Sequence, residues 1–241
     1  MEDKNQIRPL LPITASQKDL ESVADALLSE NPPGATVIST SNAPNMAGFI
    51  YVPSIKLYVA EQRSLQNNNW NQAHEELAKQ KGKMLTIPQF EEFIKYLKHG
   101  YKDKRKAEAI LDDVLTVRDP WRAEHLDAYF EEKNGVLHIN YDHTFTGGKL
   151  KVGKSEPLKD YLTANKTPGI DLDDLLTKAN KHGLPKPDFK QGELYYYAPV
   201  NGAVARFGAN SGRAGLSCSG DPSGWDGRLG VRVAKILGGN K

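Results

Sequence analysis

The spacing of apolar residues changes along the chain from helical to strand-like. Near the N-terminus, apolar residues recur at i, i+3, i+4, i+7 and i+8 from Leu20 to Leu28, which predicts a helix over 17–29. Residues 31–48 are rich in Pro, Asn, Ser and Gly and are expected to form an irregular connector. We therefore expect an N-terminal helical extension over residues 1–45.

The pattern becomes that of strands at residue 49 and then that of two amphipathic helices. β-branched and aromatic residues fill 49–52 and 55–59, which predicts one bent strand or a hairpin. Asn69 is placed to cap one helix, and a second helix is expected to begin near Pro88. The predicted inward faces are Trp70, Ala73 and Leu77 on the first helix, and Phe90, Phe93, Ile94 and Leu97 on the second.

Residues 100–190 differ from their flanks because they are more charged and more segmented. Their spacing predicts helices over 107–115, 120–130 and 171–182, and a strand over 136–141. We interpret this segment as an inserted mixed subdomain.

The last section alternates short apolar anchors with glycine. A strand is expected over 194–198 and a final strand over 229–236, whereas 201–230 holds eight of the 21 glycines of the chain. Four alanines in this stretch are expected to be packing positions: Ala203, Ala205, Ala209 and Ala214. The mixture of helices and strands predicts an α+β protein.

Charge and cysteine content narrow the function classes. The formal net charge is only +2 and the basic residues are dispersed, which disfavours nucleic acid as a partner. The single cysteine, Cys218, cannot form an intramolecular disulfide or a thiolate metal cluster. We find no apolar run long enough for a membrane span and no secretory signal, so we expect any display at a surface to depend on a partner.

Two segments resemble a known family. Residues 68–97 resemble the two-helix signature of C-type-lectin-like folds, with Trp and Ala in one helix, a glycine, a short Leu-containing segment and an acidic-aromatic helix. Residues 202–235 resemble the variable region of the target proteins of diversity-generating retroelements. The matching features are the terminal strand Leu229-Gly230-Val231-Arg232 and Pro222, which precedes it.

This resemblance implies a C-type-lectin-like core over about 46–99 and 191–238, in a domain spanning 46–241. It also implies a variable ligand-binding region over about 201–232. In this family a reverse transcriptase miscopies template adenines, typically in AAC codons for Asn, and such codons cannot become Lys, Glu, Gln or Met codons. These four residue types make up 48 of the 241 residues, yet none occurs in 201–234. Steric avoidance of long side chains in a glycine-rich region is the alternative explanation.

The function that the resemblance implies is recognition and not catalysis. The expected ligand is a protein or glycan on a host or neighbouring cell surface, as in viral or microbial attachment at a tail tip or cell envelope. No catalytic residue, cofactor or metal is expected. The candidate contacts are Arg206, Phe207, Asn210, Ser211, Arg213, Leu216, Ser217, Cys218, Asp221, Ser223, Trp225, Asp226 and Arg228.

Two alternatives remain open on motif grounds. Residues 148–155 satisfy the phosphate-binding pattern G-x-x-x-x-G-K-S, although Pro157 interrupts the helix that should follow. The formylglycine-generating enzymes share the lectin-like fold, but that resemblance implies paired cysteines, which this chain lacks.

Metal-binding motifs are incomplete in this sequence. His74 stands in an H-E-x-x-H-like position, but Ala78 replaces the second histidine, so we expect a solvated helix face there. His138 and His143 are expected on opposite faces of a strand, and the calcium motifs of lectins are not intact.

Overall fold

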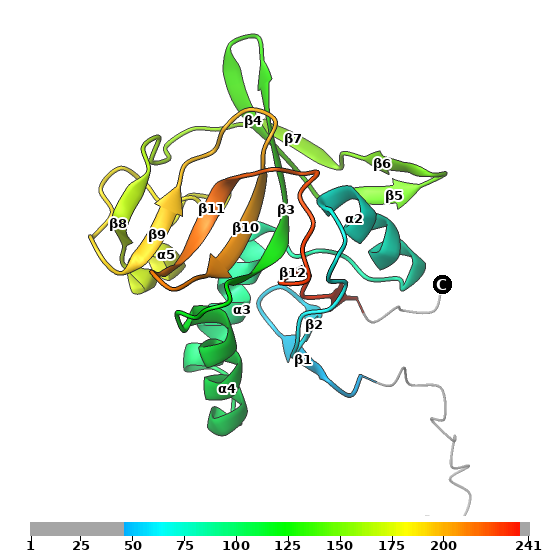
Figure 1. Cartoon of the computed structure of the whole chain (residues 1–241), viewed down its shortest axis with the longest axis vertical. Helices are drawn as coiled ribbons and strands as arrows, with labels where there is room; N and C mark the ends of the chain where they lie inside the picture. The colour runs from blue at the N-terminus through cyan, green and yellow to red at the C-terminus, as the bar shows by residue number, and fades with distance from the viewer. Residues whose placement is uncertain (1–45, 237–241) are drawn as a thin grey trace, which may run out of the picture. The chain divides into compact units, whose positions relative to one another are not determined.

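The computed structural model describes residues 46–236 of the chain (Figure 1). The predicted helix over 17–29 and most of the connector over 31–48 lie outside the described residues. Within the described part, helices and strands are mixed, so the predicted α+β class is confirmed. No helix of this part has the length and apolarity needed to cross a membrane.

A small antiparallel sheet joins the beginning and the end of the described chain. Its order is β1-β2-β13, with bounds Phe49–Val52, Leu57–Ala60 and Ala234–Lys235. β1 and β2 form the predicted hairpin, with Phe49 opposite Ala60. The C-terminal strand therefore depends on the N-terminal hairpin for its pairing.

A larger sheet has the order β7-β4-β3-β10-β11-β9-β8, and β12 pairs with β3 in addition. The bounds are β3 Arg122–Lys133, β4 Val136–Tyr141, β7 Lys154–Pro157, β8 Lys166–Ile170, β9 Leu194–Tyr197, β10 Val204–Ala209, β11 Ala214–Gly220 and β12 Leu229–Gly230. β5 (Thr144–Thr146) and β6 (Lys149–Lys151) form a separate hairpin. The predicted strands over 136–141 and 194–198 are confirmed as β4 and β9.

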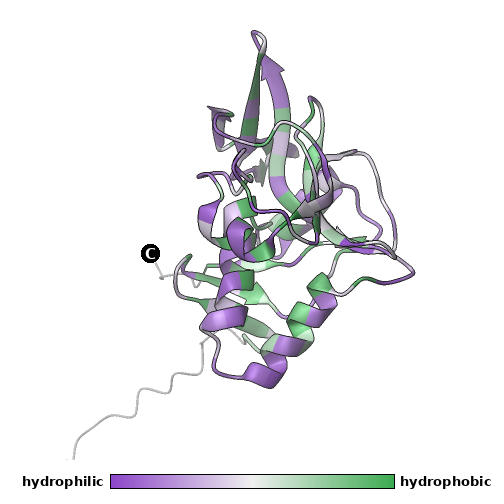
Figure 2. Cartoon of the chain, turned by 90° about the vertical axis from the view of Figure 1, so that its left-hand side faces the viewer, coloured by the Kyte–Doolittle hydropathy of each residue, from purple (hydrophilic) through white to green (hydrophobic). Residues whose placement is uncertain are grey.

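Four helices pack around these sheets: α2 Trp70–Lys79, α3 Ile87–His99, α4 Lys104–Leu115 and α5 Leu172–Lys178. Capping boxes begin α2 and α3, in which the side chains of Asn69 and Thr86 accept hydrogen bonds from the backbone of the third helical residue. In Figure 2 the helices carry both hydrophilic and hydrophobic segments, as amphipathic helices do. All seven residues predicted to face inward from α2 and α3 are buried.

The prediction of a helix over 120–130 is wrong, because this segment is part of β3. β3 lies between β4 and β10, and nearly all residues of its first half are buried on both faces. A strand that is covered on both sides does not alternate between polar and apolar residues, so its sequence carries no period of two. Within residues 100–190, β3 therefore shares one sheet with β10, a strand from the last section of the chain.

Two predicted elements differ in their extent from what their sequence spacing indicates. α5 ends at Lys178 and not at residue 182, because the Asn180 side chain accepts hydrogen bonds from the backbone of His182 and Leu184 and holds a turn there. The predicted final strand over 229–236 is divided into β12 and β13, which belong to different sheets.

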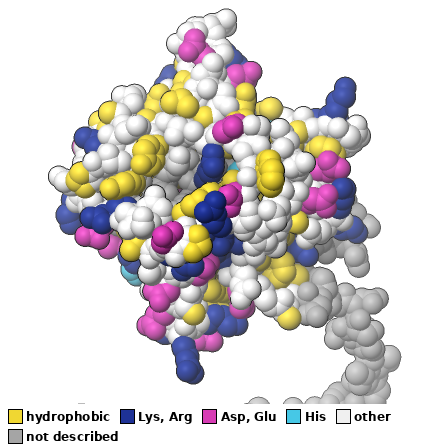
Figure 3. All heavy atoms as spheres, viewed as in Figure 1, with side chains coloured by type: hydrophobic (Ala, Val, Ile, Leu, Met, Phe, Trp, Pro, Cys, Tyr) yellow, Lys and Arg dark blue, Asp and Glu magenta, His cyan; other side chains and the backbone are white. Residues whose placement is uncertain are grey.

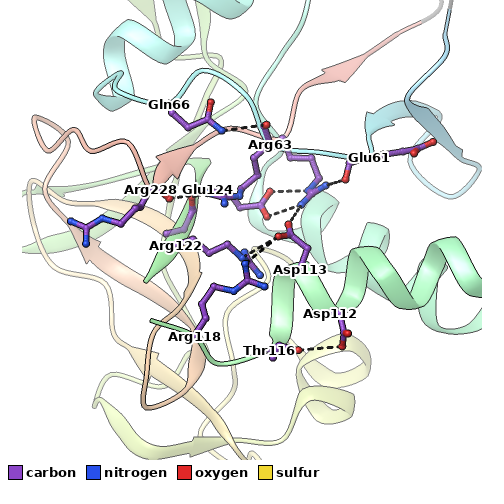
Figure 4. A network of polar contacts seen from close by, with 12 residues as sticks. Glu61, Arg63, Gln66, Asp112, Asp113, Thr116, Arg118, Arg122, Glu124 and Arg228 are labelled. Carbon is purple, nitrogen blue, oxygen red and sulfur yellow. Dashed lines mark hydrogen bonds and ion pairs between the residues drawn. The ribbon is translucent and has the colours of Figure 1, made fainter. Parts of the chain in front are cut away.

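A buried ion pair lies where the chain passes from β12 to β13. The Arg232 guanidinium donates to both carboxylate oxygens of Glu124, at 3.0 and 3.2 Å, and to the backbone oxygen of Ala60 at 3.1 Å. Figure 4 shows Glu124 and Asp113 directed toward the surrounding arginines, including Arg63. The pair thus connects β3 of the large sheet to the end of β2 in the small sheet.

Candidate functional site

The candidate site lies on the outward face of β9, β10 and β11. In Figure 1, α3 and α5 lie behind these strands, which leaves the near face of the sheet free of helices. Side chains alternate along β10 and β11, so Phe207 and Leu216 point inward while Arg206 and Ser217 point outward. Arg206 pairs with Ser217, and Ser217 pairs with Tyr197 on β9, which brings three outward side chains into one row.

Close approach of the strands makes a groove on this face, with a volume of about 380 Å³. A Cβ atom on Gly215 would lie 2.2 Å from the backbone oxygen of Tyr195, and one on Gly208 would lie 2.7 Å from the Cβ of Ala123. Only glycine fits at these two positions, so no side chain rises from the sheet there, and this leaves the groove open. The lining residues are Trp121, Arg122, Ala123, Tyr195, Tyr197, Arg206, Gly208, Ala209, Asn210, Arg213, Gly215, Ser217, Ser219 and Gly220.

The polar groups of the groove are basic or neutral. Among the described residues, none that lines this groove is acidic. Arg206 lies against Gly220, its Nε is enclosed without a hydrogen-bond partner in the described part of the chain, and burial lowers the pKa of its guanidinium. Figure 3 shows basic and acidic side chains among hydrophobic and neutral ones on this side of the molecule. Such a surface suits a ligand with acidic or hydroxyl groups and a flat apolar face.

A tight turn fixes the end of the β10–β11 hairpin. The Asn210 side-chain oxygen accepts hydrogen bonds from the backbone of Gly212 at 2.8 Å and of Arg213 at 3.0 Å. This arrangement is an Asx-type turn, in which the side chain takes the place of a backbone acceptor. Arg213 is exposed beside this turn, so it projects from a well-defined backbone.

The segment after β11 forms a second exposed region. The Asp226 carboxylate binds the Arg228 guanidinium at 2.6 and 2.7 Å, which lowers the pKa of Asp226 to about 2. The Arg228 guanidinium lies 4.8 Å from the ring centre of Trp121, a cation–π contact that links this segment to the groove. Trp225 is 68% exposed, which is unusual for so large an apolar side chain.

The structure divides the thirteen predicted contact residues into three groups. Four line the groove: Arg206, Asn210, Arg213 and Ser217. Six lie outside it on exposed or half-exposed loops: Ser211, Asp221, Ser223, Trp225, Asp226 and Arg228. Three are corrected, because Phe207, Leu216 and Cys218 are buried in the core and cannot contact a ligand. Strand alternation turns them inward, and the glycine-rich sequence of 201–230 does not make this alternation evident.

Several residues that line the groove are not among the predicted contacts, including Trp121, Tyr195, Tyr197 and Ser219. Tyr195 and Tyr197 alternate with the buried Leu194 and Tyr196, so the period of two in this strand could have identified them. The four alanines predicted as packing positions are all buried.

Residues 148–155 do not adopt the arrangement of a phosphate-binding loop. They form β6 and the beginning of β7, and the strand β8 follows before the next helix, α5, so no helix begins directly after the lysine. The Lys154 ammonium lies 3.2 Å from the Asp142 carboxylate and over the ring of Tyr141. The Lys154 ammonium is thus paired with side chains at the end of β4.

A cluster of titratable side chains lies apart from the groove. His74 is buried at 4% exposure, so the prediction that it lies on a solvated helix face is wrong. Its neighbours are Asp127 and His143, and burial lowers the pKa of His74 to about 4, which keeps the imidazole neutral near pH 7. The cluster was not predicted because the apolar spacing over 120–130 indicates a helix, whereas Asp127 lies on β3.

Comparison with known proteins finds no matching family model, no matching curated protein and no matching solved structure. The function must therefore be inferred from the residues themselves.

Proposed function

We propose that this chain is a ligand-binding protein with a C-type-lectin-like fold, which uses the groove on β9, β10 and β11 for recognition. Its ligand is a protein or glycan on a host or neighbouring cell surface. Residues 201–232 are varied by a diversity-generating retroelement. The sequence resemblance and the absence of Lys, Glu, Gln and Met from 201–234 support the last statement.

The separation of two kinds of position in β10 and β11 is the observation that carries this proposal. Inward positions hold core residues such as Phe207, whose ring centre lies 5.0 Å from that of Phe90 on α3. Outward positions such as Arg206 and Ser217 line the groove and contribute little to the core. A segment built this way can change its binding surface while it keeps its fold.

The groove combines a constant part with a variable part. Trp121, Tyr195 and Tyr197 lie outside 201–232 and supply aromatic surface of the kind that contributes most to interface energy. Arg206 and Arg213 lie inside the variable region and can adjust charge and hydrogen bonding. The constant aromatic residues would then provide affinity, while the variable residues would select the partner.

Two libraries of the full chain test the recognition surface. One randomises Arg206, Asn210, Arg213 and Ser217 with adenine-mutated AAC codons, and the other randomises Ala205, Phe207, Leu216 and Cys218, which are buried and do not line the groove, with the same codons. We expect most members of the outward library to remain folded and to yield binders from panels of immobilised glycans and cell-surface proteins. We expect most members of the inward library to be insoluble.

The aromatic groove residues outside 201–232 provide the control for this selection. Binders from the outward library should lose affinity by about tenfold or more when Tyr195 and Tyr197 are both changed to Ala, because hot-spot aromatics each contribute about 1–2 kcal/mol or more. Binding that survives this double change would place recognition elsewhere. A gene neighbourhood without a reverse transcriptase and an Asn-codon-rich near-copy of 200–232 would contradict the retroelement part alone.

A further inference from the structure

Three potential metal ligands converge from parts of the chain that are far apart in sequence. His74 lies on α2, Asp127 on β3, and His143 in the loop between β4 and β5. Their ligand atoms all lie within 4.8 Å of one another. His74 Nε2 is 3.6 Å from Asp127 Oδ1, and His143 Nδ1 is 2.5 Å from the same oxygen.

Burial leaves this cluster with few other partners. The His74, Asp127 and His143 side chains are 4%, 1% and 2% exposed. His74 Nε2 is enclosed and has no hydrogen-bond partner among the described residues, although it points toward the carboxylate. In the same part of the chain, Asp127 has no ion pair with a lysine or arginine. A buried carboxylate between two imidazoles is a strong local site for a cation.

We propose that His74, Asp127 and His143 bind one divalent transition-metal ion, for which Zn²⁺ is the natural probe. Zinc takes His nitrogen and Asp oxygen at about 2.0–2.2 Å in tetrahedral geometry, so neighbouring ligand atoms lie roughly 3.4 Å apart. The separation between His74 and Asp127 fits this value. The separation between His143 and Asp127 is that of a hydrogen bond in the metal-free arrangement, and it must widen by about 1 Å. Three protein ligands leave one position for a water molecule.

The surroundings hold the ligands in place. The Asp127 Oδ2 atom accepts a hydrogen bond of 3.0 Å from the backbone of His143, which directs Oδ1 toward the imidazoles. Trp70 packs edge-on against both rings, with ring centres 4.4 Å from His74 and 4.9 Å from His143. In protein metal sites, hydrogen bonds from surrounding groups, such as this bond from the His143 backbone, orient the side chains that bind the metal.

The ion would tie α2, β3 and the β4–β5 loop together. Disulfides cannot do this in a chain whose only cysteine, Cys218, is buried in the core. A structural metal is the other common way to cross-link distant segments, because its binding free energy adds to folding free energy.

The experiment uses the full chain, stripped with EDTA and then titrated with Zn²⁺ or Co²⁺. We expect about one ion per chain by elemental analysis, together with the visible absorption of tetrahedral Co²⁺. We also expect a rise in melting temperature of about 5–10 °C when free zinc exceeds its dissociation constant by about 100-fold.

Two ligand variants and one control locate the site. His74→Gln and His143→Gln should lose the cobalt spectrum and the zinc-dependent rise in melting temperature, whereas His99→Ala, at an exposed histidine on α3, should keep both. If the variants unfold, the cobalt titration of the unaltered chain still tests the proposal, because it requires no substitution. A stripped chain that binds neither ion, or a cobalt spectrum that survives in both ligand variants, would overturn it.

Discussion

Phe207 and Ser217 are ten residues apart on the paired strands β10 and β11, but their roles are opposite. The Phe207 side chain is 3% exposed and packs against Phe90, whereas Ser217 lines the groove. Phe207→Ala should lower the free energy of unfolding by about 3–5 kcal/mol, because it removes a buried ring and leaves a cavity. Ser217→Ala should change it by about 0.5 kcal/mol or less. Chemical denaturation of both variants measures the difference, and equal effects would mean that the strand alternation is wrongly placed.

Glu91 on α3 lies beside apolar side chains, including Leu172 and Leu175 of α5. Its Oε1 atom is enclosed without a hydrogen-bond partner among residues 46–236, and burial raises the pKa of the carboxyl well above 4.5. A raised pKa in the folded state means that the unfolded state loses its proton first. The contribution of Glu91 to stability is therefore present below about pH 4.5 and is lost as the pH rises through the folded pKa.

Glu91→Gln should consequently stabilise the protein at pH 7 and leave its stability nearly unchanged at pH 4. Each unit of difference in pKa corresponds to about 1.36 kcal/mol, and each kcal/mol raises the melting temperature of a chain of this size by about 2–4 °C. Melting curves at both pH values make the comparison. Glu92→Gln, which alters a more exposed carboxylate on the same helix, serves as the control. An equal gain from Glu91→Gln at both pH values would exclude the ionisation mechanism.

Among the elements, those with a clear period and a capping residue could be predicted from the sequence. α2 and α3 have Asn69 and Thr86 at their first turns and bury one face each, so local signals and tertiary packing agree. The β1–β2 hairpin and β9 were predictable because β-branched and aromatic residues fill them. The bounds of these elements follow mainly from signals in their own sequence.

β3 could not be predicted because its environment overrides its local pattern. Its first half is covered on both faces, and it includes Arg122, Glu124 and Asp127, whose burial depends on partners distant in sequence. Asp113, Arg232 and His143 supply those partners. The groove was half predictable: four of its lining residues were among the predicted contacts, but which positions of β10 and β11 face inward or outward depends on strand pairings that no local signal fixes.

At the scale of the whole molecule, Arg232 joins the two sheets. Its guanidinium is bound by Glu124 of β3 and by backbone oxygens at the end of β2, and its side chain is 1% exposed. Arg232→Ala leaves the Glu124 carboxylate buried without this partner, which should cost about 3–5 kcal/mol. Arg228→Ala removes the exposed pair with Asp226 and should cost about 1 kcal/mol or less.

A paired replacement separates the charge from the packing at this junction. Glu124→Leu combined with Arg232→Met removes both charges and fills similar volume, so it should lose less stability than Arg232→Ala alone. Urea unfolding of the three variants measures this. A double variant less stable than Arg232→Ala would mean that the Glu124 carboxylate stabilises the neighbouring Arg63 and Arg122 even without Arg232.

The outer strands of the large sheet, β7 and β8, contain Pro157 and Pro168, and both prolines are exposed. Proline and lysine on such strands prevent a second chain from adding to the sheet, which is a frequent route to aggregation. The groove residues Arg206 and Ser217 lie on β10 and β11, whose backbones are paired on both sides. Aromatic or aliphatic substitutions in the groove would therefore expose no free strand edge of the kind from which amyloid-like pairing begins.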